Sequence, residues 1–279
     1  MNHPAELAIN QYLEDATSGK STMSEETVQQ IGNDVMDAMR RQFGGGKGRD
    51  EFRLRMSNIG KPTCQLWFAK NKPEEALPKP TTFVMNMLLG DIVEAAFKGI
   101  IKEAGYPYED KDNFVTLQLG DAMIKGSYDI VVDGAMDDVK SASDWSYRNK
   151  FESYDTLQKS DPFGYVGQLA GYAKASGKKV GGWWVVNKAN GNIKYVPADG
   201  LDLDEQIAKL EKTVATVDEN KFERCFAPVP ETFRGVPSGN TVLNDSCKFC
   251  DFRFSCFDIE ELPSKVSKAK TLPIVAYVK

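Results

Sequence analysis

The chain has 279 residues, of which 41% are hydrophobic and 27% charged, a balance typical of a globular protein with a buried core. A net charge of −5 excludes a protein held on DNA mainly by a broad basic surface. No apolar run is long enough to cross a bilayer and no secretory signal pattern is seen, so we expect a soluble, cytoplasmic protein without a membrane partner. The single histidine, His3, is expected to lie in a frayed terminus, which argues against Ser-His-Asp and Cys-His catalysis.

The first 43 residues are predicted to be helical, with a break at Ser18-Gly19. The glycine-rich stretch at 44–48 is interpreted as a flexible link, because it lacks the spacing of a phosphate-binding P-loop. From Arg40 to Lys61 the chain has seven basic residues and two acidic ones. This segment is either a solvated surface or an arm that contacts phosphates, and we favour the arm slightly.

The rest of the chain alternates between helical and strand patterns. Apolar residues at three- and four-residue steps predict helices, and alternating or continuous apolar runs predict strands. The expected helices are 83–104, 163–176 and 203–217, and the expected strands are 114–119, 122–132, 137–142, 180–187 and 193–196. This order predicts an α/β fold with a central mixed β-sheet flanked by helices.

We expect a single domain over residues 1–279. Its parts are a helical and basic N-terminal region (1–62), a core (83–200) and a C-terminal helix with a cysteine-rich segment (201–279).

Candidate catalytic residues begin with Asp138 and Lys140, which share one face of a predicted strand while Val139 points into the core. Asp129, in the preceding strand, is positioned to lie beside Asp138. Two convergent carboxylates suit Mg²⁺ or Mn²⁺, which prefer oxygen ligands. The same alternation points Asp137 away from this site. An acid two residues before a lysine is common, however, and its ordinary interpretation is an exposed strand.

Two helices supply further candidates. Glu94 follows Gly90 by one helical turn, and glycine at that position allows another backbone to approach the helix. Gln168 and Tyr172 are four residues apart and therefore share a helix face, a pattern that usually reflects packing.

The order of these motifs resembles the PD-(D/E)XK nuclease superfamily, in particular its RecB-like branch, over roughly residues 83–186. The resemblance implies a restriction-endonuclease-like core in which Glu94, Asp129 and Asp138 bind metal. Lys140 would be the catalytic lysine, and Gln168 and Tyr172 would form the Q-x3-Y motif. Many members of the branch have a histidine ligand near the helical glutamate. This chain has none there, which leaves the number of metal ions open.

Five cysteines are present, and Cys247, Cys250 and Cys256 form a C-x2-C-x5-C pattern. Such tight spacing indicates a metal rather than disulfides, with Cys64 or Cys225 as the fourth ligand. Spacing alone leaves zinc and iron–sulfur as alternatives.

AddB-like and CRISPR-adaptation nucleases have a [4Fe–4S] cluster with one cysteine before the core and three after it. The resemblance therefore implies that Cys64, Cys247, Cys250 and Cys256 are ligands of the cluster and that Cys225 is spare. The cluster would join the two end segments of the chain, and four phenylalanines were expected to shield it: Phe249, Phe252, Phe254 and Phe257.

The expected function is that of a Mg²⁺- or Mn²⁺-dependent exonuclease acting on DNA ends or single strands in recombination, repair or replication, of the kind found in phages and bacteria. A helicase, recombinase or single-strand-binding protein is an expected partner. The alternative is an inactive, cluster-stabilised DNA-binding module. Trp145, Tyr147, Arg148 and Lys150 follow the D-x-K strand, and base stacking and plain packing are about equal interpretations of them.

Overall fold

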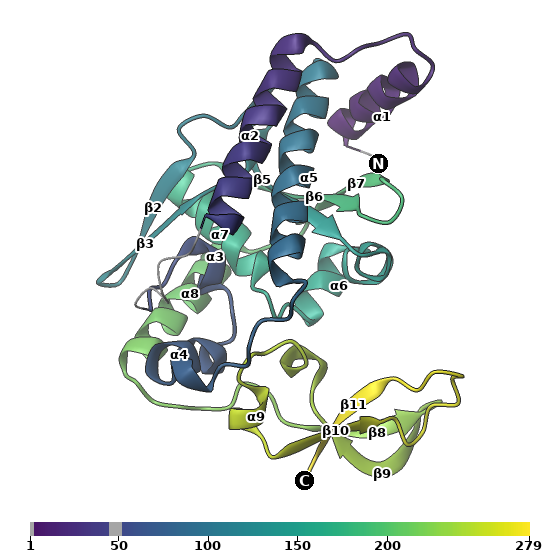
Figure 1. The fold of residues 1–279 in the computed structure, drawn as a ribbon. Helices are drawn as coiled ribbons and strands as arrows, with labels where there is room; N and C mark the ends of the chain where they lie inside the picture. Colours follow the sequence, from purple (N-terminus) through teal and green to yellow (C-terminus); the bar gives the residue numbers. More distant parts are fainter. Residues whose placement is uncertain (1–2, 45–51) are drawn as a thin grey trace.

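The computed structural model describes residues 3–44 and 52–279, and its helices and strands are placed in Figure 1. The helices are α1 (Pro4–Thr17), α2 (Glu25–Phe43), α3 (Met56–Ile59), α4 (Thr63–Asn71), α5 (Phe83–Glu103), α6 (Tyr154–Lys159), α7 (Tyr165–Ser176), α8 (Leu203–Asp218) and α9 (Arg253–Cys256), with short η1 (Pro73–Glu75), η2 (Ser146–Lys150) and η3 (Asp245–Cys247). The strands are β1 (Tyr108–Glu109), β2 (Phe114–Leu119), β3 (Ala122–Ser127), β4 (Ile130–Val132), β5 (Ala135–Ala142), β6 (Lys179–Asn187), β7 (Ile193–Pro197), β8 (Val229–Phe233), β9 (Val236–Val242), β10 (Ile259–Pro263) and β11 (Ile274–Val278).

A five-stranded mixed sheet forms the centre of the fold, in the order β1-β4-β5-β6-β7. β5 and β6 are parallel, and the other neighbours are antiparallel. Parallel neighbours require a crossover connection, and the segment with α6 and α7 supplies it. The predicted mixed sheet flanked by helices is therefore confirmed.

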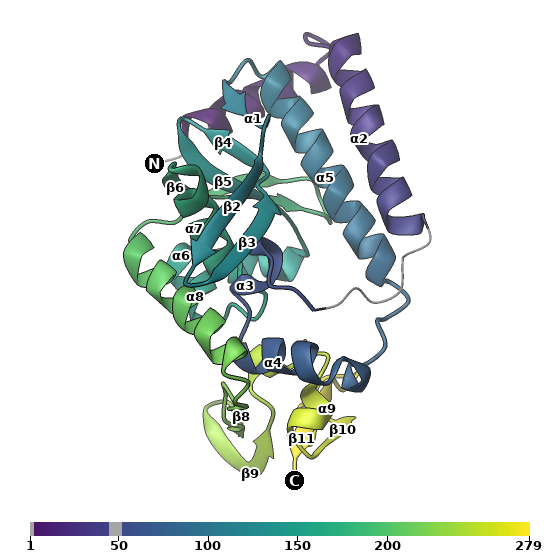
Figure 2. The ribbon, with the colours of Figure 1, turned by 90° about the vertical axis from the view of Figure 1, so that its left-hand side faces the viewer.

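The two faces of this sheet pack against different helices (Figures 1 and 2). On one face, residues of α1 and α5 pack with β4, β5 and β6 around the fully buried Trp184. On the other face, α7 and α8 pack around Trp183, which is also fully buried. Both tryptophans therefore belong to the core. Val139 faces the α5 side, so Asp138 and Lys140 alternate to the other side of β5.

One predicted strand is divided in two. The expected strand 122–132 is β3 and β4, which belong to different sheets: β3 pairs with β2 in a separate two-stranded hairpin, and β4 pairs with β5. Tyr128 and Asp129 form the connection between them. The prediction of one continuous strand was wrong, because apolar alternation continues across a point where the chain changes its pairing partner.

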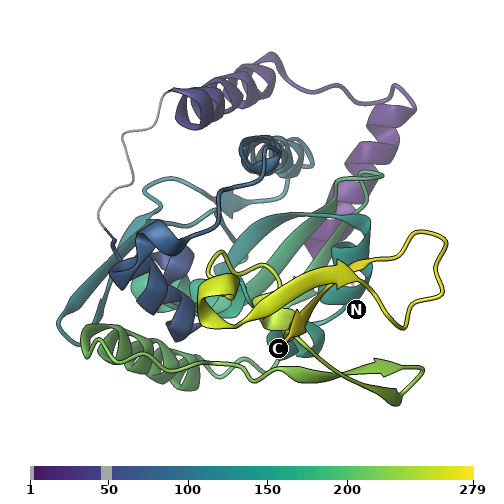
Figure 3. The same cartoon turned by 60° about the horizontal axis from the view of Figure 1, so that its bottom comes forward.

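The C-terminal segment forms a second, four-stranded sheet, β10-β11-β9-β8, that the sequence did not predict. It lies beside α4 and α9, at the end of the molecule that comes forward in Figure 3. A separate apolar cluster joins it to α4, with Phe68 stacked on Phe252 at 5.3 Å. Residues far apart in sequence therefore pack together here.

The N-terminal predictions are confirmed in part. Two helices with a break at residues 18–24 match the expectation. The glycine-rich link and much of the basic segment lie outside the described residues, so the proposed phosphate-contacting arm stays a prediction. Within the described part, Arg40 pairs with Asp37 and Arg41 with Asp91. Across the described residues, no helix is both long enough and apolar enough to traverse a bilayer.

Candidate metal and nuclease site

Asp138 and Lys140 form an ion pair on β5. The Lys140 Nζ atom lies 2.5 Å from Oδ2 of Asp138, whose side chain is almost fully buried. Apart from the Lys140 ammonium, neither carboxylate oxygen of Asp138 has a hydrogen-bond partner among the described residues. A buried anion in this state needs compensating positive charge, which Lys140 provides and a bound cation would increase.

Asp129 lies beside this pair because of the sheet register. Ile130 is opposite Asp137 in the antiparallel β4–β5 pair, so the same register extended by one residue places Asp129 opposite Asp138. The backbone N–H of Val139 donates to Oδ2 of Asp129 at 2.8 Å, which fixes the carboxylate next to β5. The two aspartates therefore share one region, as predicted.

Glu94 reaches the same region from α5. The helix packs against β5 here, and a Cβ atom at Gly90 would lie 3.8 Å from Oγ of Ser141, an ordinary van der Waals distance, so this approach does not require glycine. Lys98 is one turn further along the helix, and its Nζ atom lies 2.6 Å from Oε1 of Glu94. Lys98 was not identified from the sequence, although its spacing from Glu94 is typical of a helical ion pair.

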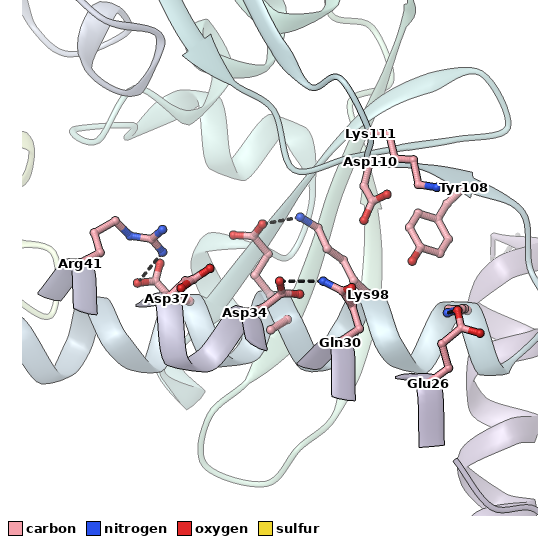
Figure 4. A pocket seen from close by; sticks show the side chains of 13 residues that line it. Glu26, Gln30, Asp34, Asp37, Arg41, Lys98, Tyr108, Asp110 and Lys111 are labelled. Carbon is pink, nitrogen blue, oxygen red and sulfur yellow. Dashed lines mark hydrogen bonds and ion pairs between the residues drawn. The ribbon is translucent and has the colours of Figure 1, made fainter. Parts of the chain in front are cut away.

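A polar cavity of about 780 Å³ opens beside Glu94 and Lys98, between α2 and α5. Figure 4 shows Lys98 pointing into it, with Asp34 and Asp37 from α2 on one side and Asp110 on the other. Asp129, Asp138 and Lys140 do not line this cavity. Glu94 is thus the carboxylate of the site that is most accessible from the α2 side.

The electrostatics of the site follow from burial and crowding. Burial, with the nearby charge of Asp138 as the second cause, raises the pKa of Asp129 to about 6. Burial also raises the pKa of Asp138 and of Glu94 above their ordinary values. Burial would lower the pKa of Lys140, but the carboxylates of Asp138 and Asp129 outweigh it and the pKa is raised. The ammonium therefore stays charged beside crowded carboxylates.

Helix α7 brings Gln168 and Tyr172 to this region. The two residues lie one turn apart on the same face of α7, and the pKa of the buried Tyr172 is raised to about 12, mainly by burial and also by Asp129 and Asp138. A Cβ atom at Gly126 would lie 2.9 Å from the Tyr172 hydroxyl, so glycine there leaves room for the phenol. Tyr165 was missed in the sequence, yet the Lys140 Nζ atom lies 5.0 Å from its ring centroid.

All six predicted site residues therefore come together. They include three carboxylates, whose oxygens fit a hard divalent cation rather than zinc, and one lysine. Within residues 3–44 and 52–279, however, no three His, Cys, Asp or Glu side chains are close enough to form a ready-made metal site. The fit to a metal thus depends on the buried, unsatisfied oxygens of Asp138.

The cysteines gather where α4 meets the C-terminal segment. Cys247 and Cys256 are buried, and Cys250 packs on the same apolar cluster as Phe68 of α4. Cys64, also on α4, lies near enough for its pKa to respond to Cys256. The C-terminal C-x2-C-x5-C pattern and the distant Cys64 therefore face one region.

Cys225 lies in this region as well, although the sequence suggested that it was spare. Its sulfur accepts a hydrogen bond from the Cys64 backbone N–H at 3.1 Å and lies 3.2 Å from the Thr63 hydroxyl. A hydrogen bond from the Cys64 thiol lowers the pKa of Cys225 and raises that of Cys64. Five thiols, rather than four, thus lie in this region, although no three of them in the described residues are placed to hold a metal ion.

Two of the four expected shielding phenylalanines were wrongly assigned. Phe252 and Phe257 are buried with the cysteines, as expected. Phe249 is 70% exposed and Phe254 is 42% exposed, so both rings point toward solvent. Adjacent positions in a short turn cannot all face one centre.

His3 is not in a frayed terminus, and that expectation was wrong. It caps α1 by accepting a hydrogen bond from the Ala5 N–H, and its ring packs 4.5 Å from the Tyr195 ring. Asp137 points away from the site, as predicted, and accepts hydrogen bonds from Gly182, Trp184 and Tyr195. Neither residue belongs to the candidate site.

Comparisons with known proteins add little. No family model matches the sequence, and no curated protein matches it. The solved structures that match include one titled "Crystal structure of SSO0001", at 13% sequence identity and a TM-score of 0.43, covering 80% of this chain and 94% of that chain.

Proposed function

We propose that this protein is a Mg²⁺- or Mn²⁺-dependent DNA nuclease of the PD-(D/E)XK type, with a restriction-endonuclease-like core. The observation that carries the proposal is the convergence of Glu94, Asp129, Asp138 and Lys140 from three separate elements. Three acids and one lysine at a sheet and a helix suit hydrolysis of a phosphodiester. Histidine cannot act as the metal ligand or base instead, because the only histidine in the sequence, His3, packs against Tyr195 outside the site.

Each residue has a role in this proposal. Asp129, Asp138 and Glu94 are the metal ligands, and a bound divalent ion would acidify a water molecule and stabilise charge on the phosphate. Lys140 orients the attacking water or the phosphate through its ammonium group. Gln168 and Tyr172 position the DNA strand. Lys98 holds Glu94 in place until the substrate and metal are bound.

The cysteine region supports a [4Fe–4S] cluster as part of the same proposal, with structural zinc as the alternative. Cys64, Cys247, Cys250 and Cys256 are the proposed ligands, and the close approach of Cys225 to Cys64 makes Cys225 a competitor for one position. Such a cluster would join α4 to the C-terminal sheet and close a loop of nearly two hundred residues, which is entropically costly without a strong bond.

The test is digestion of end-labelled single- and double-stranded DNA with Mg²⁺ or Mn²⁺. Wild type should release nucleotides from labelled ends and leave circular single-stranded DNA intact if it is an exonuclease. Lys140→Met should abolish cleavage and keep DNA binding. Lys174→Met is a matched control, since Lys174 lies on the exposed side of α7 and pairs with Asp204 at 3.5 Å. DNA binding without cleavage by wild type would instead support the inactive, cluster-stabilised module.

A further inference from the structure

Three aromatic rings lie in sequence from the candidate site to the surface. The Tyr165 ring, 5.0 Å from the Lys140 ammonium, packs nearly parallel to the Phe163 ring at 5.6 Å between centroids. The Phe163 ring lies 6.1 Å from that of Phe249, which comes from the distant cysteine segment. We call these three rings the aromatic ladder.

The outer end of the ladder is exposed. Phe249 is 70% and Phe163 is 40% exposed, although both are large apolar side chains. Single exposed apolar residues are ordinary, but two that meet across separate segments next to a candidate catalytic lysine form a shared surface. Packing into the hydrophobic core therefore does not explain why the Phe163 and Phe249 rings meet at the surface.

Positive charge borders the ladder. The Lys150 Nζ atom lies 4.6 Å from the Phe163 ring centroid and 4.7 Å from that of Tyr165. Within the described parts of the chain, no carboxylate lies within ion-pair distance of Lys150. Flat rings bordered by an ammonium group match bases bordered by phosphates.

We propose that the aromatic ladder, with Lys150, binds the unpaired bases and phosphates of a single DNA strand and leads that strand to Lys140. The proposal rests on the nuclease function and adds a preference for single-stranded over duplex DNA. The faces of paired bases are hidden in the duplex stack, whereas unpaired bases can stack on protein rings. Phe249, as the outermost ring, is the expected platform for the first base to arrive.

The test measures fluorescence anisotropy of a labelled oligo-dT strand and of a labelled hairpin duplex, in EDTA so that no cleavage occurs. Wild type should bind the single strand more tightly. Phe249→Ala should weaken single-strand binding by roughly five- to tenfold, the loss expected for one stacked base, and leave duplex binding unchanged. Phe249→Trp keeps a ring and should retain binding, whereas Phe249→Leu should behave like the alanine variant.

Phe254→Ala is the matched control, because Phe254 is an exposed ring of the same segment that faces Arg253 at 5.0 Å and not the ladder. It should bind like wild type. Equal binding of single strand and duplex, or no effect of Phe249→Ala, would overturn the proposal.

Cleavage assays with Mg²⁺ separate the ladder proposal from the nuclease proposal. If cleavage is absent but Phe249→Ala still weakens single-strand binding, only the nuclease function fails. If cleavage is present without the Phe249 effect, only the ladder fails.

Discussion

Replacing Lys140 by methionine removes one charge from the centre of the molecule and keeps most of the side-chain volume. Lys140 is the cation closest to Asp138, with Nζ and Oδ2 2.5 Å apart. Asp138 is only 2% exposed, and apart from Lys140 neither of its oxygens has a hydrogen-bond partner among the described residues. The variant would therefore leave the buried Asp138 carboxylate without a neighbouring positive charge, so we expect the folded state to lose stability.

The size of the effect follows from the geometry. Two unit charges 2.5 Å apart attract by about 7 kcal/mol at an effective dielectric constant of about 20. Part of this attraction offsets the cost of removing the Lys140 ammonium from water, because its side chain is only 18% exposed. Breaking a buried pair in this way costs about 3–5 kcal/mol, and we expect Lys140→Met to lower the free energy of unfolding by that amount.

A double-mutant cycle isolates the charge interaction from changes in packing. Wild type, Lys140→Met, Asp138→Asn and the double variant are unfolded by urea in metal-free buffer. The double variant should lose much less stability than the sum of the single variants, because it leaves no buried charge unpaired. If the single effects add to within about 0.5 kcal/mol, the two side chains do not interact and the reasoning about the site is wrong.

Three further predictions concern other parts of the molecule. Asp137→Ala should lower the free energy of unfolding by about 3–5 kcal/mol in urea titrations, because three buried donors lose their acceptor; an effect below about 1 kcal/mol would contradict this. Cys250→Ala should remove the brown colour and visible absorbance of the purified protein and lower its melting temperature, whereas a colourless, fully active wild type would speak against the cluster. Burial lowers the pKa of His3, so the unfolded chain is protonated first as the pH falls. The free energy of unfolding should therefore decrease below about pH 6.5, and a His3→Asn variant that shows the same decrease would refute this origin.

The strand and helix positions of the site residues could be predicted because they depend on local periodicity. Alternation on β5 placed Asp138 and Lys140 on one face and Val139 in the core, as the structure has them. Helical spacing placed Gln168 and Tyr172 together. The same rule predicts an ion pair between Lys98 and Glu94, one helical turn earlier. Such pairs are common on helices, so the spacing alone did not mark Lys98 as a site residue.

What could not be predicted depends on contacts between distant segments. Asp129 lies where the chain changes from the β2–β3 hairpin to the central sheet, and local alternation gives no sign of that change. The C-terminal sheet was missed because three of its four strands contain a proline and β9 also contains a glycine, and both residues argue against strands in a sequence. The approach of Cys225 to Cys64, 161 residues away, has no local signature.

The position of Asp129 between two sheets has a mechanical consequence. The β2–β3 hairpin packs into the main core through Leu117, Leu119 and Ile124, and its last residues lead directly into the connection that carries this carboxylate. The hydrogen bond from Val139 fixes the other end of that connection to the central sheet. The position of this one carboxylate therefore depends on two sheets at once, so a change in the packing of either sheet would alter its distance from Asp138.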